Sequence, residues 1–441
     1  MPNYDRAATS RFSFLATACA LGSVVLLPAA KTAPAPLTPA ASAAPLSPAV
    51  EAELKDKDHK NLGKDLALYF EANATKKGLT DAIQGLEKSL GKIEKKLKGG
   101  DPLALTEDLG RSLWYAQEYD KVKGLKKGKI QTYELDRPWD LEYSLHLPKK
   151  YNPKQSYPLL LCIPPAGKKV SDHLVEDWID AELRDEALIA IVSMPDDAEM
   201  WDQRGSPDKP GGGGNVRIVY GDITLKCAVD FDRVFLVGTG EGVATAVSIA
   251  AESPDWFAGV IGRSGDVAAD MRADNFANLP SLFISAGKGA TEFSERAKEL
   301  EVSCTLKSEG GEKEILEWVR ETSRQGNPQK VTFVTDSPYV NKAYWIEMPR
   351  AEGERRIEAS VDRESNTITI TGKGSESVTL LLNDLLVDLE RPVKVVCNGL
   401  EHVNEIPRNR KTMLDMMYKR RSDPGKVYVA RNTYDLAASP D

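Results

Sequence analysis

The spacing of hydrophobic and polar residues divides the chain into three folded parts. From 51 to 128, apolar residues such as Leu62 and Leu66 recur at helical spacing among many Lys, Glu and Ala residues, which predicts two to four amphipathic helices. From 129 to 335, continuously apolar runs alternate with helical stretches. From 343 to 436, alternating or apolar runs are separated by turn signals. The pattern therefore predicts a helical segment, an α/β domain and a small β-rich domain.

The central part has the pattern of strands that are buried on both faces. The expected strands are Ile130–Leu135, Leu141–Leu147, Pro158–Ile163, Ala187–Met194, Val234–Gly238, Ala258–Ile261 and Ser281–Ser285. The helical stretches between them are Asp172–Glu186, Val243–Ala251 and Thr291–Leu300. Continuous apolar runs are typical of parallel strands that helices cover on both sides. We therefore expect a mostly parallel sheet, with any ligand bound at the carboxyl ends of its strands.

Turn signals complete the prediction of secondary structure. In the C-terminal part, Asn398-Gly399 is a strong hairpin signal, and with the short strands around it this predicts a β-sandwich. The Gly211–Gly214 run lacks the Gly-Lys-Ser/Thr ending of a phosphate-binding loop, so it predicts a flexible loop. Trp201 lies just before that run and is expected to line the mouth of a pocket.

The first fifty residues have the pattern of an export signal and a linker. Arg6 and Arg11 precede an apolar run, Phe12–Leu27, and small residues follow it, which predicts a secretory signal over 1–30. The run is short for a membrane span of about 20 residues, although an uncleaved anchor is an alternative. Residues 31–50 are rich in Ala and Pro, as expected of a linker. The protein is therefore expected to be secreted, periplasmic or in the cell envelope, with no transmembrane domain beyond the signal.

Composition narrows the possible partners. The net charge of -8 and a pI near 5.4 leave no global basic field for a nucleic-acid backbone.

The five cysteines show no CxxC spacing and no nearby histidine, which argues against a zinc ribbon, a redox motif or a dense disulfide framework. Buried free thiols are expected, with a Cys162–Cys227 bridge as the alternative. We predict no metal site and no cofactor.

One strand–turn–helix segment resembles a known family. The strand Val234–Gly238 runs into Thr239-Gly240-Glu241-Gly242 and then a helix. This segment resembles the nucleophile elbow of α/β-hydrolases, and it is most similar to secreted bacterial esterases of the feruloyl-esterase and polyester-depolymerase type. Their elbow is G-x-S-x-G, with the serine presented above the sheet. The outer glycines match Gly238 and Gly242, whereas the serine position is Gly240. The resemblance covers about residues 130–335.

The other positions that the resemblance implies also depart from the family pattern. The oxyanion loop corresponds to 162–167, where Pro164 and Pro165 remove backbone N–H donors. The segment expected to carry the catalytic acid, 286–290, has no carboxylate. No histidine occurs between His173 and His402, so the expected base is absent. A serine nucleophile needs a base within hydrogen-bond reach, and we therefore expect the chemistry to be lost.

Several polar residues are still expected to converge at the carboxyl edge of the sheet. The first interpretation is a pocket for a carboxylate, sugar or polyester fragment, formed by Gly240, Glu241 and Arg263, because amides at a helix start favour anions. The second is a replacement dyad in which Lys288 is the base for Ser264. The third is an ordinary ion-pair cluster of Arg263, Glu241 and Asp266 in a vacated site.

Three functions follow from these interpretations. The leading hypothesis is an exported pseudoenzyme that binds a small molecule, glycan, polymer ester or partner at the vacated pocket. The second is an active carboxylesterase-type hydrolase that uses Ser264 as a displaced nucleophile. The third is a structural envelope protein, which is favoured if Arg263, Glu241 and Lys288 pair with one another in a closed cavity. A binding role instead requires an open cleft.

Overall fold

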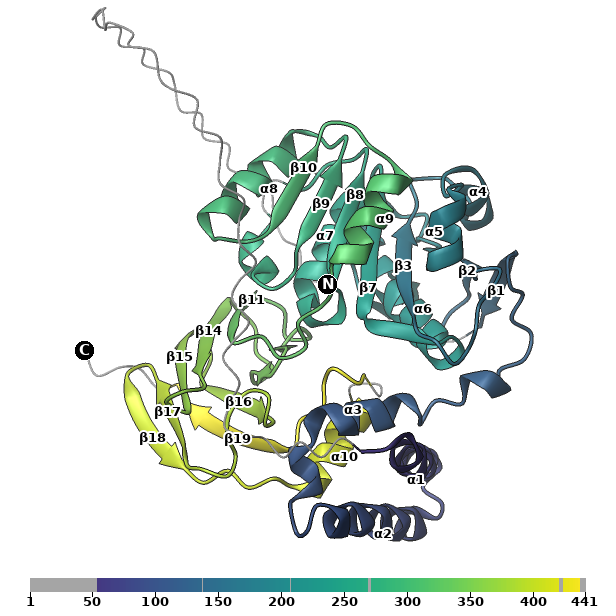
Figure 1. Cartoon of the computed structure of the whole chain (residues 1–441). Helices are drawn as coiled ribbons and strands as arrows, with labels where there is room; N and C mark the ends of the chain where they lie inside the picture. Colours follow the sequence, from purple (N-terminus) through teal and green to yellow (C-terminus); the bar gives the residue numbers. More distant parts are fainter. Residues whose placement is uncertain (1–53, 137, 207, 269–270, 420–422, 437–441) are drawn as a thin grey trace, which may run out of the picture. The chain divides into compact units, whose positions relative to one another are not determined.

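The structure is a computed structural model (Figure 1) that describes residues 54–436 except 137, 207, 269–270 and 420–422. The expected signal, 1–30, and linker, 31–50, lie outside the described residues. Within the described part, no helix has the length and hydrophobicity that crossing a membrane requires.

An eight-stranded sheet forms the centre of the α/β part, in the order β1-β2-β4-β3-β7-β8-β9-β10. Its strands are β1 (Ile130–Leu135), β2 (Leu141–His146), β3 (Tyr157–Ile163), β4 (Leu188–Val192), β7 (Val229–Thr239), β8 (Gly259–Arg263), β9 (Ser281–Ile284) and β10 (Cys304–Lys307). Strand β2 is antiparallel to both of its neighbours, and the other pairs are parallel. The predicted mostly parallel sheet is confirmed.

Helices cover both faces of this sheet because its strands are apolar on both sides. In β3, Leu159 and Leu161 belong to one buried cluster, whereas Leu160 and Cys162 belong to another; neighbouring strand residues point to opposite faces. The helices are α4 (Val170–Glu176), α5 (Ala181–Glu186), α6 (Gly212–Lys226), α7 (Gly242–Glu252), α8 (Lys288–Glu299) and α9 (Glu312–Glu321). Helices α4, α5 and α9 contribute to the cluster of Leu160, and helices α6, α7 and α8 to that of Leu159.

The Gly211–Gly214 run is not a flexible loop, so that prediction was wrong. Gly211 is the N-cap of α6, and the next three glycines are its buried first turn. A Cβ atom on Gly212 would lie 2.1 Å from the carbonyl oxygen of Trp201, and one on Gly214 would lie 2.2 Å from that of Arg204. The glycines are therefore required for the close approach of segment 201–205 to the helix.

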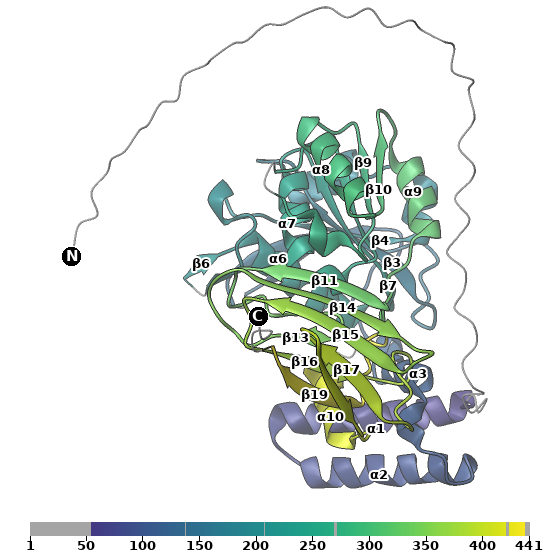
Figure 2. The ribbon, with the colours of Figure 1, turned by 90° about the vertical axis from the view of Figure 1, so that its left-hand side faces the viewer.

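The C-terminal part is a two-sheet structure, as predicted (Figure 2). One sheet has the order β11-β14-β15-β17-β18 and the other β12-β13-β16-β19. The strands are β11 (Lys330–Thr335), β12 (Lys342–Ala343), β13 (Ile346–Glu347), β14 (Arg355–Asp362), β15 (Thr367–Lys373), β16 (Ser377–Leu382), β17 (Val393–Cys397), β18 (Leu400–Asn404) and β19 (Ala430–Asp435). Strand β11 pairs with β14, so the sandwich includes residues that we had placed in the α/β domain.

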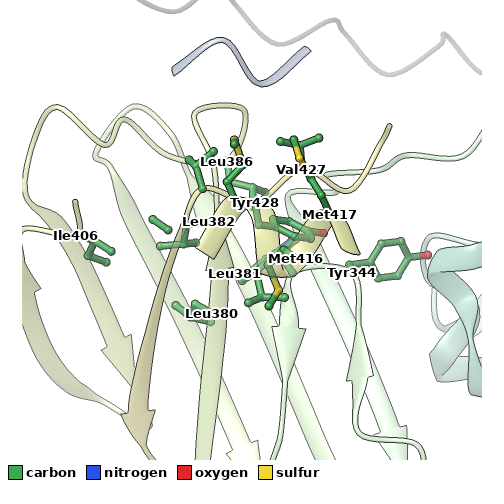
Figure 3. Close-up of a cluster of buried hydrophobic side chains, with 14 of the residues drawn as sticks. Tyr344, Leu380, Leu381, Leu382, Leu386, Ile406, Met416, Met417, Val427 and Tyr428 are labelled. Carbon is green, nitrogen blue, oxygen red and sulfur yellow. The ribbon is translucent and has the colours of Figure 1, made fainter. Parts of the chain in front are cut away.

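The N-terminal helices share a hydrophobic core with this sandwich. They are α1 (Asp56–Thr75), α2 (Leu79–Lys96) and α3 (Thr106–Trp114). Leu66 and Leu109 belong to the same buried cluster as Leu381 of β16 and Met416 of α10 (Arg410–Lys419), the latter two of which Figure 3 shows. A Cβ on Gly110 would lie 2.4 Å from the carbonyl oxygen of Pro424. The two ends of the described chain therefore stabilise each other.

A buried charged network joins the central domain to the sandwich. Arg324, which follows α9, donates to Asp423 at 2.6 and 2.7 Å and to Asp232 of β7 at 2.8 Å. Lys426 pairs with Asp255 at 2.9 Å. The Arg324 side chain is 0% exposed and that of Asp423 is 3% exposed. Charges are buried only when they are paired and hydrogen-bonded, so these residues form one connected unit.

Candidate functional site

The turn between β7 and α7 has the geometry of a strand-to-helix elbow. Gly240 has φ of 56°, in the left-handed region, and its N–H donates to the carbonyl of Arg263 at 3.0 Å. A Cβ on Gly238 would lie 2.3 Å from the carbonyl oxygen of Gly242, and one on Gly242 would lie 2.7 Å from that of Ile163. Small residues are therefore obligatory on both sides of Gly240, as a sharp elbow requires.

The strand order and this elbow together decide the fold. The elbow follows the central strand β7 and opens a helix, with an antiparallel second strand at the far side of the sheet. The central domain has an α/β-hydrolase-like fold. In α/β-hydrolases the middle residue of such an elbow presents the nucleophile above the sheet, and Gly240 is the middle residue here.

Comparisons with known proteins give partial matches. No family model matches the chain. A protein named as a candidate esterase, NocK, from Nocardia uniformis subsp. tsuyamanensis is 35% identical over 88 residues, which is 19% of this chain and 26% of that protein. The match thus spans about a quarter of the curated relative.

Three esterase structures align with under half of this chain. A thermostable esterase has 17% identity and a TM-score of 0.37, covering 44% of this chain and 63% of its own. A ferulic acid esterase has 14% identity and a TM-score of 0.38; the alignment covers 44% of this chain and 98% of the esterase chain. The S-formylglutathione hydrolase FrmB from Staphylococcus aureus has 10% identity and a TM-score of 0.35; the alignment covers 44% of this chain and 98% of the FrmB chain.

The middle position of the elbow, Gly240, carries no side chain. A Cβ on Gly240 would lie 3.1 Å from Cβ of Pro165 and 3.8 Å from its Cα. A serine could therefore be placed at this position with a small displacement of Pro165. The elbow therefore leaves room for a small side chain at this position.

The side chain of Glu241, the residue after Gly240, contacts the loop that follows β3. In α/β-hydrolases the oxyanion donors are the N–H of the residue after the nucleophile and an N–H from the loop after the third core strand. The carboxylate of Glu241 accepts from the backbone N–H of Ala166 at 3.2 Å. Hydrogen bonds from the backbone N–H of Glu241 itself and from that of Ala166 lower the pKa of the carboxyl group. The carboxylate of Glu241 thus engages the backbone N–H groups of Ala166 and of Glu241 itself.

The contact of Glu241 is expected to be pH-dependent. Because its pKa in the folded protein lies below the usual value, the contact is complete above the usual pKa and is lost as pH falls through the lowered one. We expect the amide proton signal of Ala166 to move when pH is lowered from about 6 to about 3 in an NMR titration. Glu241→Gln should abolish this transition, and Glu107→Gln should leave it unchanged. A titration that survives in Glu241→Gln would contradict the assignment.

Arg263 is held by α4 and the segment after it, and it does not pair with Glu241. Its Nη1 donates to the carbonyl of Asp177 at 3.1 Å, and its guanidinium lies 4.6 Å from the ring centroid of Trp178. A cation–π contact with tryptophan stabilises this orientation. Of the predicted binding residues, Gly240 and Glu241 are neighbours in the elbow, and the backbone carbonyl of Arg263 accepts from the N–H of Gly240.

The two histidines nearest the sheet are structural. His173 of α4 is buried; its Nδ1 bonds Asp177 Oδ2 at 2.7 Å, and its Nε2 accepts from Trp178 Nε1 at 3.2 Å. With both ring nitrogens engaged, no lone pair is available to activate a nucleophile. Burial lowers the pKa of His173. His146 of β2 bonds the carbonyl of Arg184 at 3.1 Å, away from the elbow.

The structure does not bring the lysine of the predicted dyad to its serine. Ser264 is exposed, with φ of 50°, directly after β8. Lys288 is the first residue of α8; its side chain is 89% exposed and pairs with Glu292 at 2.9 Å. That hydrogen bond raises the pKa of Lys288, the opposite of what a lysine base needs. Among the described residues no hydrogen bond joins Ser264 and Lys288, so the dyad stays a prediction without geometric support.

The predicted ion-pair cluster has separate partners. Asp266 accepts from the backbone N–H groups of Val267 at 2.9 Å and Ala290 at 2.8 Å, at the start of α8. Within the part of the chain that is described, Glu241, Arg263 and Lys288 form no ion pair with one another. The condition that would favour a purely structural role is therefore not met.

An open groove of about 580 Å³ lies beside α7. Trp201 is in its wall, as are Thr245 and Ser248 of the helix, but Gly240, Glu241 and Arg263 are not among its lining residues. Sequence reasoning placed Trp201 at a pocket and overlooked the hydroxyl face of α7. The signal was present, because Thr245 and Ser248 are polar residues in an otherwise apolar helix. Among the described residues, no group of three or more metal-ligating side chains occurs.

Proposed function

We propose that the protein is a non-hydrolytic member of the α/β-hydrolase structural class that binds a ligand or partner outside the cytoplasm. The observation that carries this proposal is the carboxylate of Glu241 on the backbone N–H of Ala166, 3.2 Å away. A negative charge on these donors opposes the developing oxyanion of ester hydrolysis, which the same donors would otherwise stabilise.

The absence of the other catalytic parts supports the same conclusion. Position 240 is glycine, and the sequence has no histidine between His173 and His402. Serine hydrolysis requires a nucleophile, a base that accepts its proton and donors for the oxyanion. Since all three are altered independently, restoring one should not restore activity. The predicted export signal supports a location outside the cytoplasm, and small-molecule, glycan or ester ligands are the proposed partners.

Ser264 is the residue on which the alternative, an active ester hydrolase, depends. It is an exposed serine in the left-handed region at the carboxyl end of β8. A non-glycine residue in that region is strained, and strain of this kind concentrates at functional sites. The alternative still lacks a base, because Lys288 pairs with Glu292.

Fluorophosphonate labelling tests the two possibilities directly. We expect no labelled serine by mass spectrometry and no hydrolysis of short p-nitrophenyl esters above the buffer rate, with an active esterase as the positive control. Gly240→Ser should remain unlabelled because no histidine is positioned to activate it. Specific labelling of Ser264 or any other serine in the unmodified protein would overturn the proposal and identify the nucleophile.

A further inference from the structure

The groove beside α7 has the size and the walls of a small-molecule site. Its 580 Å³ fall within the range of about 300–1,000 Å³ that is typical of ligand pockets. One wall is formed by residues between Ala198 and Gln203, a second by Ala268, Met271 and Arg272, and the end by the chain that leaves β11. None of these residues belongs to the elbow or to the loop after β3.

The floor of the groove is one face of α7 and carries an unpartnered hydroxyl. Ala244, Thr245, Ser248 and Ala251 follow helical spacing along this floor. The Thr245 residue is only 6% exposed, and no hydrogen bond is formed by its hydroxyl with another described residue. Unlike the hydroxyl of Thr106, it is not one of the fully buried unpaired atoms of the described residues. A ligand in the groove could therefore hydrogen-bond to it.

The walls are held in place by hydrogen bonds of their own. The indole N–H of Trp201 donates to the carbonyl of Pro195 at 2.8 Å. The side-chain amide of Asn275 donates to the carbonyls of Ala251 at 2.9 Å and Val334 at 2.8 Å, which fixes the end of α7 against β11. A groove with rigid walls loses little entropy when a ligand binds.

The charged groups around the groove select for a cation. Glu199 and Asp202 are exposed carboxylates on one wall, and Asp336 lies at the end. The positive charge of Arg272 is engaged by Asp336 at 3.3 Å and by Glu354 at 3.3 Å. A ligand that offers N–H donors would find acceptors at the wall and at the hydroxyl floor. A carboxylate or phosphate would be repelled.

We infer that the groove binds an organic cation, specifically a primary amine carried on an apolar body. The apolar part would contact Trp201 and Met271, and the ammonium group, with three donors and no acceptor, would reach Thr245 and the carboxylate of Asp202. This inference rests on the binding role proposed above, and it does not depend on the loss of hydrolysis.

This inference is tested by isothermal titration calorimetry of the full purified chain. The binding affinities of three indole compounds of similar shape and different charge are compared. Tryptamine carries the ammonium group, indole-3-ethanol is its neutral counterpart, and indole-3-propionate is the anion. We expect tryptamine to bind, the alcohol to bind at least about tenfold more weakly, and the anion not to bind. Tryptamine affinity should fall as salt is raised, since exposed charges are screened.

Two variants test whether tryptamine binds in the groove. Thr245→Val keeps the shape of the side chain and should weaken tryptamine binding about three- to tenfold. Asp202→Asn, on an exposed residue that cannot disturb folding, should weaken binding and flatten its salt dependence. Thr106→Val is the matched control, because Thr106 is also helical and 5% exposed, with a hydroxyl that has no partner among the described residues. It should bind as the parent does.

The outcomes separate this inference from the proposed function. Absence of tryptamine binding, equal binding of the anion, or equal weakening in Thr106→Val and Thr245→Val would each overturn the organic-cation site. None of these results would produce a labelled serine. Fluorophosphonate labelling, conversely, would overturn the non-hydrolytic function while leaving the titration unchanged.

Discussion

Arg324→Met is expected to lower the free energy of unfolding by about 3–5 kcal/mol, because it removes one partner of a buried ion pair. Methionine fills a similar volume but leaves Asp423, which is 3% exposed, without its two hydrogen bonds from the guanidinium. The carboxylate of Asp232 loses its partner as well. Asp423 keeps its contacts with Lys426 at 3.5 Å and with the N–H of Gly425 at 3.0 Å. The remaining poorly compensated buried charge, and not the lost attraction alone, accounts for the magnitude.

The loss should appear first at the contact between the central domain and the sandwich. Arg324 and Asp232 belong to the central domain, whereas Asp423 lies in the C-terminal part. Urea unfolding followed by tryptophan fluorescence measures the loss, and limited proteolysis locates it. We expect new cleavage in Arg324→Met close to Asp423 before the central sheet becomes accessible.

Arg320→Met is the matched control for this variant. Arg320 also pairs with two carboxylates, Glu182 and Glu186, but its side chain is 40% exposed. Solvent-exposed ion pairs contribute little to stability, so the control should unfold close to the parent. Equal losses in the two variants would mean that burial does not determine the contribution of the Arg324 network.

The central sheet could be predicted because its strands are continuously apolar. The missed elements lack that signal. Strand β10 (Cys304–Lys307) is an edge strand with exposed Thr305 and Leu306, so it has no apolar run. The expected helix Asp172–Glu186 is divided into α4 and α5 around the buried Trp178. Helix α6 was missed because glycine usually disfavours helices, and here close packing against segment 201–205 overrides that preference.

The position of the elbow was predictable from the sequence, but the contacts of its side chains were not. Glycine spacing located the elbow at Gly240, since local sterics require small residues there. The hydrogen bond from the backbone N–H of Ala166 to the carboxylate of Glu241 joins residues that are 75 positions apart along the chain. Arg263 was correctly placed at the carboxyl end of β8, but its packing on Trp178 depends on tertiary structure. Spacing along the chain carries no information about such contacts.

Gly212→Ala is expected to lower the free energy of unfolding by about 1–3 kcal/mol, the usual cost of overpacking. Alanine is the better helix former by up to about 1 kcal/mol, so propensity alone predicts the opposite sign. The added Cβ would lie 2.1 Å from the carbonyl oxygen of Trp201 and 2.7 Å from Sδ of Met194. Displacing backbone atoms costs more free energy than displacing the end of a flexible side chain. The steric overlap therefore outweighs the gain in helix propensity.

Gly91→Ala separates the effect of helix propensity from the effect of steric overlap. Gly91 lies inside α2, and a Cβ there would meet no atom within 4 Å. Only the helix preference acts, so this variant should be more stable than the parent by about 0.5–1 kcal/mol. Urea unfolding measures both variants. Because segment 201–205 forms a wall of the groove, Gly212→Ala should also weaken tryptamine binding, whereas Gly91→Ala should not. A stabilised Gly212→Ala would show that segment 201–205 is free to move away from α6, contrary to the close packing that makes its glycines necessary.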